Sequence, residues 1–121
     1  MACFLAPTAA AMVVGVVKSA SKDSGGDSVT KISMRTKLSW LFAMLAGGAI
    51  LLALEHIWHG EVIFAPPFLT AMQSAEATET MLTEIATVGV GMVAMVTAAW
   101  GLLVLAVTRI PVLRRAVVKA K

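Results

Sequence analysis

The residues best suited to chemistry lie in one short segment, residues 55–61, with the sequence EHIWHGE. If a helix persists here, Glu55 and His59 are four residues apart and His56 and His59 are three apart, so their side chains share a face. Glu84 begins the next apolar run and is expected at about the same depth. Glu55, His56, His59 and Glu84 therefore form a candidate site for a divalent metal such as Zn²⁺, or for a proton relay.

A simpler interpretation is favoured, in which these groups are solvated where two membrane spans meet water. Ionisable side chains indicate function chiefly when they lie within the hydrocarbon. The spacing also differs from the zinc-protease pattern, which has two His residues four apart around a Glu. The chain's only Asp residues, Asp23 and Asp27, and its single Cys3 support no catalytic triad. We expect no enzyme, and no cofactor beyond the candidate metal.

Two apolar runs without a charged side chain, residues 38–54 and 85–107, must position these groups. The whole chain is 59% hydrophobic and 14% charged, with a mean hydropathy of +0.87. These values are far from those of soluble domains. The sequence predicts an all-α membrane protein whose core is a transmembrane hairpin, with helices at residues 37–58 and 82–108.

Acidic and basic residues lie at opposite ends of the predicted hairpin. The stretch between the two runs holds five Glu and no Lys or Arg, whereas every Lys and Arg lies outside the pair. The positive-inside bias predicts a multi-pass protein of the cell membrane, with both termini of the hairpin cytoplasmic and the acidic loop, residues 59–80, outside. The net charge of +3 does not indicate nucleic-acid binding, because the cations are split between two flanks.

The loop and the tail each predict a short helix. Pro66 and Pro67 exclude a continuous helix through the loop, whereas Thr70 and Gln73 resemble a capping box that would start a short interfacial helix. In the basic tail, residues 109–121, Pro111 can start a helix whose apolar face lies on the inner membrane surface. Anionic lipid would attract its cations.

The N-terminal stretch, residues 1–33, leaves three alternatives open. It is apolar up to Val17 and then rich in Ser, Gly and Asp, like a flexible linker. It could form an extra hydrophobic helix running from outside to inside, although it is short for a bilayer core. It makes a poor signal peptide, because no Lys or Arg precedes its apolar part. Alternatively, it lies upstream of the true start, Met34.

Small residues in both spans predict helix packing. Gly47 and Gly48 lie near the middle of the first span. In the second, small or polar residues recur at steps of four and three, which predicts a left-handed helix crossing. This seam contains Thr80, Glu84, Thr87, Gly91, Ala94, Ala98 and Gly101. It should face the first helix or another subunit.

These features predict a structural or accessory subunit in the lipid bilayer, associated with another membrane protein or with further copies as a homo-oligomer. The alternative is an oligomeric ion- or metal-handling protein that uses Glu55, His59 and Glu84 at its outer face. A lesion-forming protein of the holin type fits the small size and basic tail, but not the Glu-rich loop.

Overall fold

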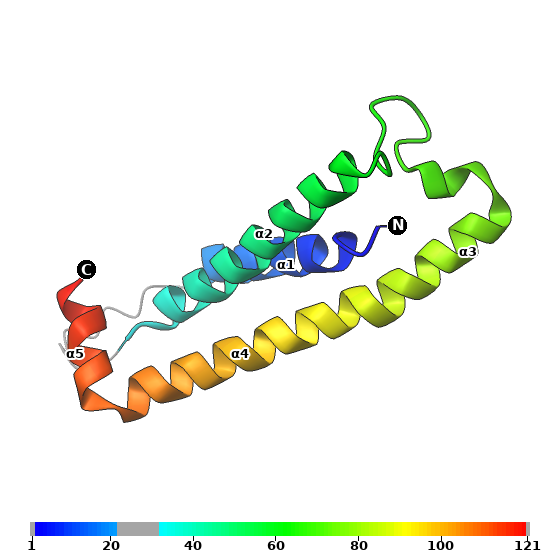
Figure 1. Ribbon diagram of the computed structural model, residues 1–121. Coiled ribbons are helices and arrows are strands. Elements are labelled where there is room, and N and C mark those ends of the chain that lie inside the picture. Colours follow the sequence, from blue (N-terminus) through cyan, green and yellow to red (C-terminus); the bar gives the residue numbers. More distant parts are fainter. Residues whose placement is uncertain (1, 22–31, 121) are drawn as a thin grey trace.

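The computed structural model describes residues 2–21 and 32–120, which are almost entirely helical and contain no β-strand (Figure 1). The all-α prediction is confirmed for this part of the chain. Two segments are long and apolar enough to span a membrane, Met34–Trp58 and Ala75–Arg109. In order, the elements are α1 (Leu5–Ala20), α2 (Met34–Trp58), a 3₁₀ turn η1 (Thr70–Gln73), α3 (Ala75–Glu84), a π-helical segment η2 (Ile85–Gly89), α4 (Val90–Arg109) and α5 (Pro111–Lys119).

Local sequence explains both ends of α2. Ser33 is the N-cap, and its hydroxyl oxygen accepts a hydrogen bond from the Thr36 N–H at 3.2 Å. At the other end, Gly60 has a positive φ of 70°, which glycine adopts without strain. The Glu61 N–H then donates to the His56 carbonyl at 2.9 Å and closes the helix end. The helix ends at Trp58, as predicted, and begins slightly earlier than residue 37.

The second long helix starts well before residue 82, because α3, η2 and α4 run as one continuous helical segment. Ser74 caps it by accepting from the Ala77 N–H at 3.2 Å. A short helix begins at Thr70, as predicted, but the capping box is absent, because η1 has no side-chain cap and the Thr70 hydroxyl instead donates to the Glu61 carbonyl. The expected helix in the loop is thus a 3₁₀ turn followed directly by the long helix.

The π segment changes which face the second helix presents. The Val90 N–H donates to the Ile85 carbonyl five residues earlier, so this turn contains more residues than an α-turn. Thr80 and Glu84 are therefore rotated about the axis relative to Gly91 and the residues beyond it. The predicted seam is interrupted where the π segment begins.

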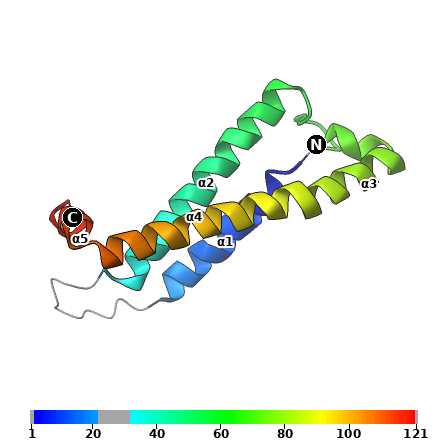
Figure 2. The same ribbon diagram turned by 60° about the horizontal axis from the view of Figure 1, so that its bottom comes forward.

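Helix α1 forms and packs lengthwise against α2, in the opposite direction (Figures 1 and 2). Their contact is close, because a Cβ on Gly15 would lie 3.3 Å from the Phe42 ring. Ala11, Leu41 and Leu45 form the buried core, and Leu45 is 1% exposed. The N-terminal stretch thus supplies a third packed helix, although its 16 residues extend only about 24 Å at about 1.5 Å per residue.

Helix α4 covers the other side of this core. Val93, Val96 and Trp100 pack against the cluster of Ala11, Leu41 and Leu45. The Trp100 indole N–H also donates to the Lys37 carbonyl at 2.8 Å, which ties α4 to the beginning of α2. Since α2 runs opposite to both α1 and α4, the described N-terminal end of the chain lies at the opposite end of the bundle from the C-terminal helix (Figure 1).

Candidate functional site

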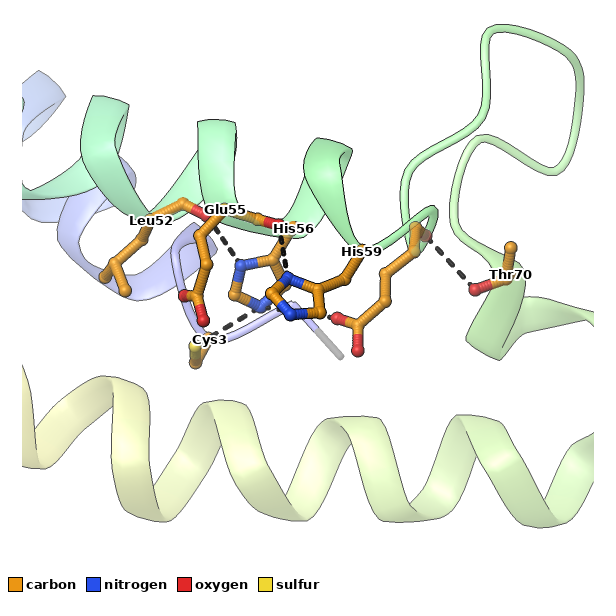
Figure 3. A network of polar contacts seen from close by, with 7 residues as sticks. Cys3, Leu52, Glu55, His56, His59 and Thr70 are labelled. Carbon is orange, nitrogen blue, oxygen red and sulfur yellow. Dashed lines mark hydrogen bonds and ion pairs between the residues drawn. The ribbon is translucent and has the colours of Figure 1, made fainter.

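The end of α2 carries His56, the buried ionisable side chain of the described residues, which is 6% exposed. Its Nδ1 lies 2.6 Å from the Leu52 carbonyl oxygen (Figure 3). Because a carbonyl oxygen can only accept, Nδ1 carries a proton and donates it. The tautomer of a neutral His56 is therefore fixed, and Nε2 is left as an acceptor.

Three segments that are distant in sequence meet at this imidazole. The Cys3 Sγ lies 3.5 Å from Nε2, and a Glu61 carboxylate oxygen lies 3.6 Å from the same nitrogen. The Phe4 ring packs edge-on against the imidazole, with centroids 5.3 Å apart. A neutral His56 can accept a weak hydrogen bond from the Cys3 thiol, whereas a protonated His56 can pair with Glu61. His56 thus links the N-terminal segment, α2 and the outer loop.

The surroundings of Cys3 oppose thiolate formation. Burial raises the pKa of the Cys3 thiol, and the carboxylates of Glu55 and Glu84 raise it further, against the opposing effect of a backbone hydrogen bond. A nucleophilic cysteine requires the reverse, a lowered pKa beside cationic groups. Cys3 therefore packs as a neutral thiol.

Gly89, the last residue of the π segment, fixes the N-terminal segment from the other side. A Cβ placed on Gly89 would lie 2.9 Å from the Ala6 Cβ and 3.0 Å from the Cys3 carbonyl oxygen. Both distances are shorter than ordinary contacts, and neither atom belongs to a flexible side chain. Glycine is needed here for close packing, so residues 3–6 are held between the end of α2 and the π segment.

The candidate metal residues are distributed differently from the expectation. His59 is exposed at the C-cap of α2, and its Nδ1 donates to the Glu55 carbonyl at 2.9 Å. Glu55 is also exposed, whereas Glu84 is half-buried on the facing helix. Among the described residues, no three His, Cys, Asp or Glu side chains are grouped to hold a metal ion. His59 keeps the helical hydrogen bond from its N–H to the Glu55 carbonyl, and its ring nitrogen is turned back onto the same oxygen.

The predicted packing residues lie mainly on open surface. Within the chain, a Cβ added to Gly47, Gly48, Gly91 or Gly101 would meet nothing within 4 Å. Thr87, Gly91, Ala94, Ala98 and Gly101 are all exposed. The seam therefore does not pack against α2. Instead, α4 contacts the bundle through Val93, Val96 and Trp100, on another face.

No local pattern predicts the contact between Cys3 and His56, because it joins residues 53 positions apart. Gly89 was visible only as one of several small residues in an apolar helix.

No protein family, curated protein sequence or solved structure matches this chain.

Proposed function

We propose that this chain is a small multi-pass membrane protein that acts as an accessory subunit, associating sideways in the bilayer through the small-residue face of α4. The exposed face of Thr87, Gly91, Ala94, Ala98 and Gly101 carries the proposal. Small residues allow two helix backbones to approach closely in lipid, where packing rather than the hydrophobic effect drives association.

The apolar surface supports the membrane location. Only 6% of the most apolar stretch of Ala75–Arg109 is buried in the molecule, and only 17% of that of Met34–Trp58. A core helix of a soluble protein would be mostly buried. At about 1.5 Å per residue, the 25 residues of α2 extend about 37 Å, enough for a hydrocarbon core of about 30 Å. Trp58, 89% exposed at the end of α2, suits the headgroup region.

Charge supports the proposed orientation. The carboxylates of Glu55, Glu61, Glu76, Glu79 and Glu84 belong to the end of the bundle that holds the outer loop. Arg35 and Lys37 begin α2, and Arg109 ends α4, at the other end. The positive-inside bias then favours a cytoplasmic position for α5 and the start of α2.

Replacing Ala98 with Leu tests the association. Because Ala98 is exposed within the chain, the larger side chain should leave the bundle intact and weaken helix association by about 1–3 kcal/mol through overpacking. Ala99→Leu is the matched control, since Ala99 is the exposed neighbouring alanine outside the seam. Energy transfer between labelled copies in vesicles measures self-association, and recovery of a partner from gently solubilised membranes measures association with another protein.

If Ala98→Leu and Ala99→Leu behave alike in both measurements, the proposed seam is not an interface. Extraction of membranes with alkaline carbonate tests the location separately. A chain released by carbonate would contradict the membrane assignment, whatever the result for the two alanines.

A further inference from the structure

A cavity of about 500 Å³ lies where the start of α2, the end of α4 and helix α5 meet. Its volume is within the range of small-molecule sites, about 300–1,000 Å³. It is lined mainly by apolar groups, with Trp40 on α2 and the Thr36 hydroxyl beside it. The lining residues are Thr36, Trp40, Leu103, Val107, Val117 and Ala120.

The backbone keeps this cavity in place. Ile110 is extended, and Pro111 starts α5 at once, so the chain bends sharply after α4 and α5 runs across the end of the bundle (Figure 1). The half-buried Val117 on α5 then faces the same space as Val107 and Leu103 on α4. The cavity is thus formed by a helix that lies across the end of the bundle.

Charge at this end of the bundle has one sign. Lys37 lies near the start of α2, Arg109 ends α4, and Arg115 and Lys119 lie on α5. None of these cations lines the cavity, but all belong to the end of the bundle at which it opens. Among the described residues, no carboxylate lies at this end, since all five described Glu residues belong to the outer end. An apolar occupant with a negatively charged head matches both the apolar lining and the cationic end of the bundle.

We propose that this cavity binds one anionic phospholipid, with an acyl chain against Trp40, Leu103 and Val117 and its phosphate among the cations at this end of the bundle. This inference rests on the proposed membrane location. With α5 at the inner surface, the cavity lies at the boundary between headgroups and acyl chains, where Trp40 is suited to the interface. The phosphate provides the charge that the cations require.

Quenching of tryptophan fluorescence tests the site directly. The full chain carrying Trp58→Phe and Trp100→Phe, which leaves Trp40 as its single tryptophan, is placed in phosphatidylcholine vesicles with a fixed fraction of phosphatidylglycerol. Bromine atoms are carried on the acyl chains of either lipid, at equal mole fraction. We expect brominated phosphatidylglycerol to quench more strongly, because it occupies the cavity beside Trp40.

Paired variants distinguish the cavity from a merely cationic surface. Val117→Phe and Leu103→Phe fill the cavity without changing charge and should abolish the excess quenching. Val118→Phe and Leu102→Phe, on neighbouring positions outside the lining, should leave it unchanged. Circular dichroism confirms that each variant is folded.

A charge pair completes the design. Lys119→Gln should weaken the preference for phosphatidylglycerol roughly fivefold, as expected for one cation near the surface. Lys18→Gln removes a cation at the same end, on α1 against the Phe42 ring, and should have little effect.

Equal quenching by the two lipids would overturn the site, as would filling variants that behave like their controls. Equal effects of Lys119→Gln and Lys18→Gln would indicate general attraction to the surface and would also overturn it. A chain that carbonate extracts from the vesicles contradicts the proposed membrane location itself, and the lipid site with it. A chain that stays integrated but shows no preference contradicts the lipid site alone.

Discussion

His56 shows how a single side chain can join remote parts of a small bundle. Its Nδ1–H donates within α2 to the Leu52 carbonyl, so Nε2 is directed at groups from other segments, Cys3 and Glu61. A buried imidazole without such partners would be costly. The chain therefore satisfies this polar group by bringing its N-terminal residues back to the end of α2.

Folding should shift the reactivity of Cys3 to higher pH. Burial and the nearby carboxylates raise the thiol pKa, so less thiolate is present at any given pH than in an unfolded chain, and alkylation is slower. The measurement is the rate of iodoacetamide reaction against pH for the folded chain in mild detergent and for the denatured chain.

Replacing Glu55 with Gln removes one of the charges that oppose the thiolate, so the midpoint of this pH profile should move down. Glu76→Gln is the control, since Glu76 is not among the groups that act on Cys3. Identical profiles for folded and denatured chains would mean that Cys3 is not buried against His56.

Glu55, His56 and His59 were grouped in the sequence because a continuous helix would align them, and a site formed by these residues stays a prediction. In the structure, the His59 ring hydrogen-bonds back to the Glu55 carbonyl, whereas His56 is buried. Cys3 became a neighbour of His56 only through tertiary packing, which no local pattern encodes.

At the scale of elements, the π segment adapts the second long helix to its neighbours. It brings Gly89 against α1, while Gly91, two residues further, faces open space. Gly89 thus belongs to the packing within the chain, whereas Gly91 belongs to the surface that other helices can contact.

Substituting Ala at these two glycines should have opposite effects. Gly89→Ala forces the Cys3 carbonyl and Ala6 apart and should destabilise the bundle by about 1–3 kcal/mol. Gly91→Ala meets nothing within the chain, so better helix propensity should make it neutral or stabilising by up to about 1 kcal/mol. Denaturant titration followed by helical circular dichroism measures both. Equal stabilities would show that α1 does not dock against the π segment.

The two long helices were predictable because uncharged apolar runs of this length are typical of long helices. The beginning of the second was misplaced because Glu76, Glu79 and Glu84 resemble a loop, although Ser74 caps a helix that includes them. The packing of α1 was left open, since its length is marginal for a membrane span. Its partners, Phe42 and Leu45, become apparent only in three dimensions.

At the scale of the whole molecule, the alternating directions of α1, α2 and α4 separate the two ends of the chain (Figure 1). The sequence predicted cytoplasmic termini for the two-helix hairpin, and that orientation remains a prediction for the start of α2 and the tail. With α1 packed as a third antiparallel helix, the N-terminal end of the chain is expected on the opposite side.

Site-directed labelling tests this arrangement. In the Cys3→Ser chain, a single cysteine at Leu5, which is 39% exposed at the start of α1, or in the outer loop at Ala65 should react with an impermeant maleimide added outside. One introduced at Ala120 should react only after the membrane is opened. Labelling of the Leu5 and Ala120 positions from the same side would contradict a membrane-crossing α1.

The contact of Cys3 with His56 spans 53 residues, and Gly89 lies still further along the chain. During translation, residues 3–6 are therefore made well before the π segment that holds them in place. Until Gly89 has been synthesised, the N-terminal residues lack this partner. We therefore expect the contacts of the N-terminal residues to be the last to form, although these residues are made first.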